Sequence, residues 1–244
     1  MVIRKWLPVI LLLCSVGFLA MNQKQRASAA DSLEGAWSLN YGGQDFAMLF
    51  EDGYCMFTQY NLKEKKFGLT AGGPFTVENG KIRIKTEFNS ANKSEVGKTQ
   101  EYGYKLSGND LTTTLEGFEL KWKRVDAGGK NLAGNWRIIK RKQGEEMSDI
   151  PLPPRRTLKL LTATRFQWAA INVETGEFSG TGGGTYTFKD GKYTEYIEFF
   201  SRDSSRVGMS LSFDGKLENG NWIHSGKSSK GDPIYEVWGT FKDK

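Results

Sequence analysis

Short alternating runs of apolar and polar residues, separated by tight turns, are the dominant pattern of this chain. The pattern is most distinct at 182–200, where glycines precede a run of strand-forming residues, the pair Asp190-Gly191 and a second alternating run. A related stretch at 72–88 has Asn79-Gly80 at the corresponding place. Such a pair between alternating runs is a strong hairpin signal. No segment after residue 30 has a convincing helical period, so the chain is predicted to be all-β.

The sequence also contains one series of motifs twice, in the same order. The matched segments are Leu33-Glu34-Gly35-Ala36-Trp37 with Leu132-Ala133-Gly134-Asn135-Trp136, Tyr54-Cys55-Met56 with Phe166-Gln167-Trp168, the two hairpins, Val96-Gly97 with Val207-Gly208, and Phe118-x-Leu120-x-Trp122 with Ile234-x-Glu236-x-Trp238. We therefore predict two tandem domains, at 31–126 and 132–244, joined by a flexible linker at 127–131. Consecutive hairpins favour an antiparallel up-and-down β-barrel for each domain, because closure removes exposed sheet edges.

An insertion at 143–154 distinguishes the second copy, and it carries three prolines near its end. Proline opposes both a helix interior and a central strand. The insertion is therefore predicted to form a loop or lid over the mouth of the second barrel.

The N-terminus has the features of a secretory signal peptide at 1–30. Two basic residues precede an apolar run at 7–20, and Ala27-Ser28-Ala29-Ala30 offers a cleavage site. The run is short for a membrane-spanning helix, although an uncleaved anchor stays the alternative. The predicted location is secreted or periplasmic.

Charge excludes a nucleic-acid partner. Four of the 34 Lys and Arg residues precede Asp31, so the predicted mature chain has 30 basic and 28 acidic residues, a net charge of +2. No long block of like charge is present, which argues against a nucleic-acid-binding arm. After residue 30 the sole cysteine is Cys55, so an intramolecular disulfide is impossible. Its position one step out of phase with Tyr54 and Met56 predicts a wall residue of the first barrel rather than a nucleophile.

Gly35-Ala36-Trp37 on the first strand resembles the signature of the lipocalin (calycin) superfamily. The resemblance implies that Trp37 plugs one barrel end beside Arg124, and that Trp136 does so in the second barrel. The second copy is also similar to a lipocalin-like family of secreted Bacteroidetes proteins with no assigned activity. That similarity rests on Leu160-Leu161-Thr162, Arg165-Phe166-Gln167-Trp168, Gly183-Gly184-Thr185-Tyr186, Trp222-Ile223-His224-Ser225-Gly226 and Tyr235-Glu236-Val237-Trp238. It implies two lipocalin-like barrels.

Comparison of the copies predicts different barrel interiors. Strand side chains alternate between faces, which makes Ile82, Ile84, Thr86 and Phe88 the inner series of one first-copy strand. Glu195 stands at the position of Ile84, and the same reasoning places His224 and Glu236 inside the second barrel. The first barrel is thus predicted to be dry. The second is predicted to bind a small molecule through Glu195, His224, Glu236, Tyr186, Tyr193, Trp168, Trp222 and Trp238, because convergent polar groups among aromatic walls are typical of ligand sites.

Several alternatives remain open at this level. The three ionisable groups form either a ligand site, for an apolar, cationic or hydroxylated molecule, or a satisfied internal network. A non-catalytic adaptor that holds an envelope protein is the main alternative function, and a weak hydrolase using Glu195 and Glu236 is another. We predict no enzyme activity, no metal, no cofactor, and a membrane association only if the N-terminal segment is retained.

Overall fold

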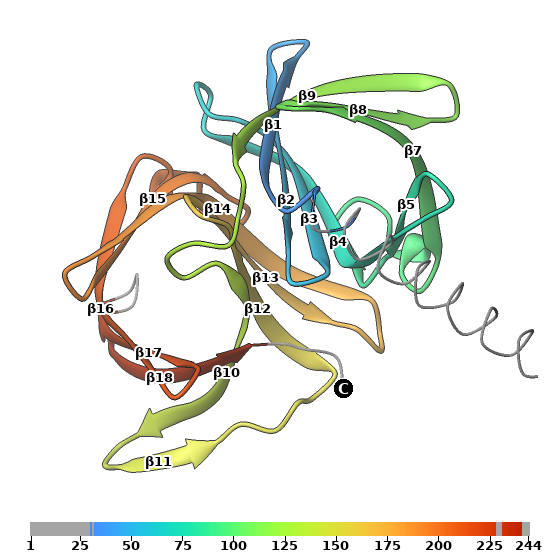
Figure 1. Cartoon of the computed structure of the whole chain (residues 1–244). Helices are drawn as coiled ribbons and strands as arrows, with labels where there is room; N and C mark the ends of the chain where they lie inside the picture. Colours follow the sequence, from blue (N-terminus) through green and yellow to red (C-terminus); the bar gives the residue numbers. More distant parts are fainter. Residues whose placement is uncertain (1–29, 31, 228–230, 241–244) are drawn as a thin grey trace, which may run out of the picture.

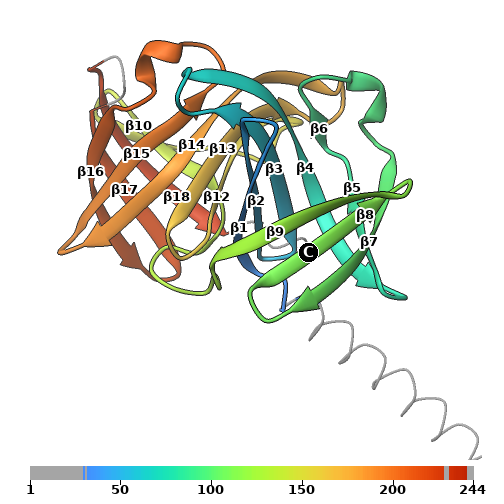
Figure 2. The ribbon, with the colours of Figure 1, turned by 90° about the horizontal axis from the view of Figure 1, so that it is seen from above.

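The computed structural model describes residues 30, 32–227 and 231–240, which form two closed eight-stranded antiparallel barrels in tandem (Figures 1 and 2). This confirms the predicted all-β fold class. The predicted signal peptide lies outside the described residues, except for Ala30. Within the described ranges, no helix is long and apolar enough to cross a membrane.

The N-terminal barrel is built from β1 to β9 in near-sequential order. Pairing of β1 with β9 and of β3 with β4 closes the sheet, while the short β6 pairs with β4. The strands are β1 Gly35–Tyr41, β2 Gln44–Glu51, β3 Tyr54–Asn61, β4 Lys66–Glu78, β5 Lys81–Lys85, β6 Phe88–Asn89, β7 Thr99–Ser107, β8 Asp110–Leu115 and β9 Phe118–Asp126, with the 3-10 turn η1 at Lys93–Glu95.

The C-terminal barrel repeats this plan from β10 to β18. Pairing of β10 with both β12 and β18 closes it, and β11 is an additional strand on β10. The strands are β10 Gly134–Gln143, β11 Glu146–Asp149, β12 Arg155–Leu161, β13 Arg165–Asn172, β14 Glu177–Lys189, β15 Lys192–Phe200, β16 Ser210–Glu218, β17 Asn221–Lys227 and β18 Pro233–Thr240, with η2 at Ser204–Arg206.

The glycines shared by the two copies have a structural cause. A Cβ atom at Gly73 would overlap the carbonyl oxygen of Lys85, and one at Gly184 would overlap that of Tyr196. Opposite Gly183 and Gly184, β15 carries a bulge with Glu198 as the extra residue. Bulges bend a strand sharply, and glycine permits the close backbone approach. The repeated glycines therefore form a corner of each barrel.

The predicted alignment of β3 with β13 is wrong by one residue. Thr70 and Thr181 are equivalent, because each hydroxyl donates to a backbone carbonyl on the neighbouring strand, that of Phe57 in one barrel and of Trp168 in the other. Phe57 therefore matches Trp168, and Cys55 matches Phe166. A one-residue slip exchanges the two faces of a strand. Cys55 accordingly lies in the core of the N-terminal barrel rather than on its outer wall, and burial raises the pKa of its thiol.

A second core, between the barrels, contains residues that the period-two pattern had assigned to the interiors. Phe88 and its counterpart Phe199 both pack in this core rather than inside their barrels. The break between β5 and β6, and the extra residue Glu198 in β15, change the parity of the following residues. The shared core also includes Leu49, Met56 and Leu160. The two barrels are thus joined by buried apolar surface as well as by the connection between β9 and β10.

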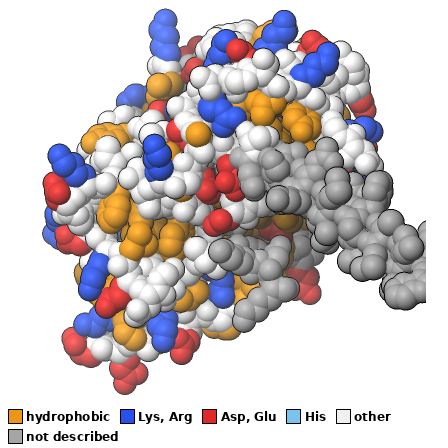
Figure 3. Space-filling model, in the orientation of Figure 1, with side chains coloured by type: hydrophobic (Ala, Val, Ile, Leu, Met, Phe, Trp, Pro, Cys, Tyr) orange, Lys and Arg blue, Asp and Glu red, His pale blue; other side chains and the backbone are white. Residues whose placement is uncertain are grey.

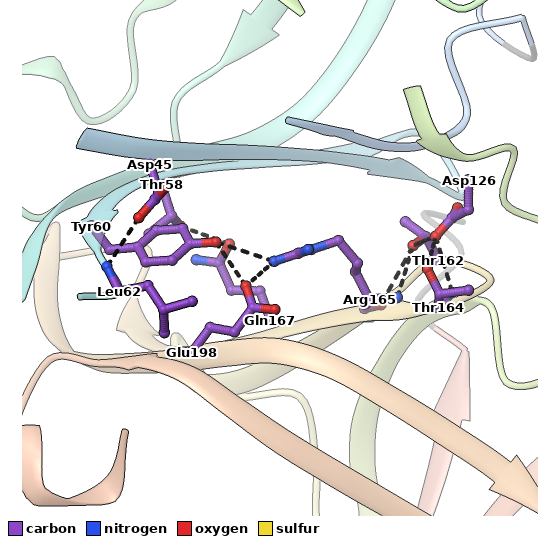
Figure 4. Close-up of polar contacts among 10 residues, drawn as sticks. All are labelled: Asp45, Thr58, Tyr60, Leu62, Asp126, Thr162, Thr164, Arg165, Gln167 and Glu198. Carbon is purple, nitrogen blue, oxygen red and sulfur yellow. Dashed lines mark hydrogen bonds and ion pairs between the residues drawn. The ribbon is translucent and has the colours of Figure 1, made fainter. Parts of the chain in front are cut away.

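Polar contacts reinforce the same interface (Figure 4). The carbonyl oxygen of the buried Gln167 side chain accepts from Thr58, and its amide donates to Thr70 and Thr181 at 2.8 and 3.2 Å. Nearby, Tyr60 donates to Glu198 at 2.7 Å, and Glu198 also pairs with Arg165. Buried polar groups must be paired to avoid a large desolvation cost. The barrels therefore fit in one specific arrangement.

The insertion at 143–154 differs from its prediction in part. Its first half forms the hairpin of β10 with β11, and only residues 150–154 form a loop. The loop begins where the Ile150 N–H donates to the Ile139 carbonyl at 2.8 Å. Its prolines explain the end of strand pairing, because proline cannot donate to a sheet.

Candidate functional site

Trp37, which is predicted to plug one barrel end, lies at the start of β1 in the core of the N-terminal barrel. The Trp37 side chain is fully buried, and its indole N–H donates to the Leu33 carbonyl at 2.9 Å. The Arg124 guanidinium lies 4.0 Å from the centroid of the Trp37 ring and also donates to the carbonyls of Ser32 and Glu34. A cation over an indole face is favourable. Trp37 and Arg124 are therefore in contact, while their role as a barrel plug stays a prediction.

The interior of this barrel contains an apolar cavity of about 260 Å³. Trp122 is the largest residue of its wall, and the Trp122 indole N–H is already satisfied by the Thr113 hydroxyl at 3.0 Å. The lining residues are Met48, Phe50, Phe57, Ile82, Ile84, Tyr102, Thr113, Leu115, Leu120 and Trp122. This apolar lining agrees with the dry interior predicted for the first barrel, but the open volume was not predicted. Volume and lining both suit a small apolar molecule.

A second cavity of about 270 Å³ adjoins the first. The two share Phe57, Ile84, Tyr102 and Leu115, which form the boundary between them. The second cavity is more polar, because Asn89, Glu95 and Gln100 contribute to its wall, with Gln100 donating to Glu95 at 2.6 Å. A molecule that spans both cavities therefore meets an apolar wall at one end and hydrogen-bonding groups at the other.

Exposed hydrophobic side chains lie on neighbouring strands of the same barrel. Leu115, which lines both cavities, is paired with Phe118 across the β8–β9 turn, and Phe118 packs edge-on against Tyr41. Phe118 and Tyr41 are 56% and 57% exposed. Exposed apolar groups beside a cavity are typical of ligand entrances or interaction sites. Elsewhere, Figure 3 shows basic and acidic side chains interspersed over one face of the molecule.

In the C-terminal barrel, the predicted inner residue Glu195 is buried as expected, but it already has partners. The Lys159 ammonium lies 2.6 Å from the Glu195 carboxylate, and the Tyr193 hydroxyl donates to the same oxygen at 2.9 Å. Both charged side chains are at most 8% exposed. A buried carboxylate requires such compensation, because an unpaired buried charge is very costly.

Aromatic rings surround the Lys159 ammonium. It lies 5.3 Å from the ring centroids of Tyr193 and Trp238, 5.5 Å from Trp222 and 5.8 Å from Phe166. These distances are within the range of cation–π attraction. The aromatic site that the sequence predicted for an apolar, cationic or hydroxylated ligand thus contains a cation of the chain itself.

Glu236 is likewise paired within the barrel. Its Oε1 accepts from Arg141 Nη2 at 2.6 Å and Nε at 3.0 Å, and its Oε2 accepts from the Trp238 indole at 3.0 Å. Burial by itself would raise the pKa of Glu236, but His224 and Arg141 outweigh it, so the pKa is lowered. A catalytic acid needs a raised pKa, so this environment does not favour Glu236 as the acid of a hydrolase.

His224 is enclosed by aromatic rings. Its Nδ1 lies 3.6 Å from Glu236 Oε2, beyond hydrogen-bond distance, and neither ring nitrogen has a hydrogen-bond partner among the described residues. Phe213 and Trp222 have ring centroids 4.3 and 5.0 Å from the imidazole. Burial lowers the pKa of His224, so the imidazole is neutral at neutral pH. Within the described ranges, no three His, Cys, Asp or Glu side chains are grouped to hold a metal ion.

The other predicted residues of this barrel are mainly structural in position. Tyr186 donates to the Thr162 carbonyl at 2.7 Å, and Trp136 donates to the Leu132 carbonyl at 2.8 Å, as Trp37 does to Leu33. Trp168 and Glu195 line a cavity of about 160 Å³ together with Phe166, Gly183, Ile197, Phe200 and Leu211. The prediction of a ligand here stays untested, but the geometry gives its charged groups partners within the chain.

Sequence reasoning did not identify Lys159 and Arg141. Lys159 was detectable in principle, because it is the single charge in the run Leu158-Lys159-Leu160-Leu161. Its flanking leucines pack between the barrels while Lys159 points inward. Arg141 had no comparable signal, since it lies among several basic residues of β10 and its exposed guanidinium reaches Glu236 only after the barrel closes.

The fold and the site define a tandem β-barrel protein with an apolar cavity in its first barrel. Among solved structures, the chain is similar to a crystal structure of an uncharacterized protein from Bacteroides eggerthii, with a TM-score of 0.32 and 11% identity, over 46% of this chain and 100% of that chain. No protein-family model and no curated protein matches the chain. A TM-score this low carries no argument about function.

Proposed function

We propose that this protein binds a small, largely apolar molecule inside its N-terminal barrel. The observation that carries the proposal is the cavity of about 260 Å³ beneath Trp122, with its more polar neighbour of about 270 Å³. A pocket of this kind selects an apolar body with a hydrogen-bonding end. The proposed function, small-molecule binding, is the one predicted from the sequence, but the proposed site is in the first barrel rather than the second.

The predicted plug at one barrel end supports a binding rather than a channel role. Trp37 and Arg124 form that predicted plug, while the exposed Phe118 and Tyr41 lie near Leu115 on the cavity wall. A secreted or periplasmic location is part of the proposal and rests on the sequence at 1–30. A carrier or sequestering protein in such a compartment requires no catalytic group.

The test uses the full chain and the neutral fluorescent probe N-phenyl-1-naphthylamine. We expect saturable binding to the wild-type protein. Ile84→Trp fills the boundary between the two cavities and should weaken binding by about tenfold or more, which corresponds to ~1.4 kcal/mol. Leu217→Trp adds the same bulk at an exposed position of the other barrel and should bind as the wild type does.

Two outcomes contradict the proposal: no saturable binding by the wild type, or equal affinity of Ile84→Trp and Leu217→Trp. Native mass spectrometry of protein from its own host supplies a second discriminator. A retained molecule should be lost from Ile84→Trp and kept by Glu195→Gln combined with Glu236→Gln. The reverse result would place the ligand in the C-terminal barrel, as the sequence alone had predicted.

A further inference from the structure

A separate cavity lies where β10 and β12 diverge. The two strands pair only from Gly134 with Leu161 to Arg137 with Leu158, after which β10 continues with β11. The resulting gap is bordered by residues 150–153 of the loop and has a volume of about 390 Å³. This volume is larger than that of either cavity in the N-terminal barrel. It is a different site from the one in the proposed function.

Among the described residues, five arginines line this cavity and no carboxylate does: the arginines are Arg137, Arg141, Arg155, Arg156 and Arg202. Arg141 and Arg156 are paired with Glu236 and Glu87, and Arg202 donates to the neutral Ser179 carbonyl at 2.6 Å. Within the described ranges, Arg137 and Arg155 form no ion pair. Convergent like charges repel one another, and an anion between them removes that repulsion.

The lining also includes apolar residues. Ile138 comes from β10, while Ile150 and Leu152 come from the loop, with Pro151 and Pro153 beside them. Proline restricts the backbone, and the loop is held at both ends, by Ile150 on Ile139 and by the Val173 N–H on the Pro154 carbonyl at 3.0 Å. A preformed wall reduces the ordering cost of binding.

We propose that this cavity binds an organic phosphate or a similar oxyanion ester. The guanidinium groups of Arg137, Arg155 and Arg202 hold the oxyanion, since the planar guanidinium fork matches phosphate oxygens. The organic group of the ligand packs against Ile138, Ile150 and Leu152. Arginine is suited to this role because it stays charged and is weakly hydrated.

The probe for the test is hexyl phosphate, titrated calorimetrically into the full chain at about 0.1 M salt, with inorganic phosphate and hexanol as partial ligands. We expect one saturable site, tighter for hexyl phosphate than for either partial ligand and weakened by added salt. Arg137→Gln with Arg155→Gln should weaken binding by about tenfold or more, because charge-assisted contacts are lost. Lys105→Gln with Lys121→Gln removes the same charge from exposed strands of the other barrel and should leave the affinity within about twofold, since distant surface charges are largely screened by salt.

Leu152→Glu places a carboxylate at the apolar wall and should abolish binding without altering a strand. The proposal is overturned if hexyl phosphate does not bind, if the arginine and lysine double variants lose affinity equally, or if Leu152→Glu binds as the wild type does. Vesicles containing an anionic phospholipid separate the sources of the oxyanion. Vesicle binding without hexyl phosphate binding would mean that the arginines act as an open surface patch, which also overturns it. Ile84→Trp should leave hexyl phosphate binding intact, so failure of one proposal is distinguishable from failure of the other.

Discussion

Lys159 is the most informative single residue to change, because its ammonium neutralises Glu195 inside a barrel. Lys159→Met keeps a long side chain but removes the charge. Among the described residues, Glu195 would then keep the Tyr193 hydroxyl as its single hydrogen-bond partner. Removing one member of a buried ion pair costs about 3–5 kcal/mol, because the remaining charge is uncompensated.

The double change Lys159→Met with Glu195→Leu should recover most of this loss. Replacement of a whole buried pair by apolar groups of similar volume is often neutral or stabilising. The Tyr193 hydroxyl loses its acceptor, which costs about 1–3 kcal/mol. We therefore expect the double variant to be within about 2 kcal/mol of the wild type and clearly more stable than Lys159→Met alone.

The assay is urea unfolding at pH 7, followed by tryptophan fluorescence and compared at equal m-values. For a chain of this size, the single variant should also unfold at a temperature lower by roughly 6–20 °C. Lys81→Met is the matched control, because Lys81 forms a lysine–glutamate pair with Glu101 on the surface of the other barrel. That exposed pair contributes at most about 1 kcal/mol.

The reasoning is refuted if Lys159→Met destabilises no more than Lys81→Met does. It is also refuted if the double variant is as unstable as the sum of its single changes, because the two residues would then not be coupled. Either result would mean that the charge on Glu195 is balanced by something other than Lys159. The C-terminal barrel would then regain its place as the site of a cationic ligand.

Two further predictions concern the contact between the barrels. Burial, followed by repulsion from Glu34, raises the pKa of Glu51 to about 8, so between the two pKa values the folded protein holds a proton that the unfolded chain has released. The free energy of unfolding should therefore fall by about 2 kcal/mol between roughly pH 5 and 8, after allowance for solvent screening. Glu51→Gln should flatten this pH dependence in urea titrations, and an unchanged slope would contradict the prediction. Gln167→Leu leaves Thr58 and Thr70 without their amide partner and should cost about 1–3 kcal/mol by the same assay; an unaltered midpoint would show that the hydroxyls find other partners.

Much of the architecture was predictable because its signals are local. The pairs Asn79-Gly80 and Asp190-Gly191 adopt the positive φ values that a tight hairpin requires, so their sequence directly encodes the turn. The repeated motifs likewise showed that whatever fold one half adopts, the other adopts too. The inward positions of Glu195 and His224 followed from period-two alternation and appear in the structure.

The predictions of which barrel face a residue occupies failed at strand irregularities. Cys55 was placed on the wrong face because its strand was aligned one residue out, and Phe88 because parity changes at the break between β5 and β6. Alternation gives the face of each residue only relative to its neighbours, so one bulge or alignment error assigns all following residues of the strand to the opposite face. No repeat comparison can detect this, since both copies carry the same irregularity.

The sequence by itself determined that the chain forms two β-barrels and that Glu195, His224 and Glu236 are buried in the second. Tertiary structure alone decided that Lys159 pairs with Glu195 and Arg141 with Glu236, and that Phe88 and Phe199 pack in the core between the barrels. It also decided that a cavity lined by Trp122 lies inside the first barrel. The physical reason is the range of the interactions. Turns and alternation are set by neighbours along the chain, whereas charge pairing and empty volume depend on which distant side chains meet when each sheet closes.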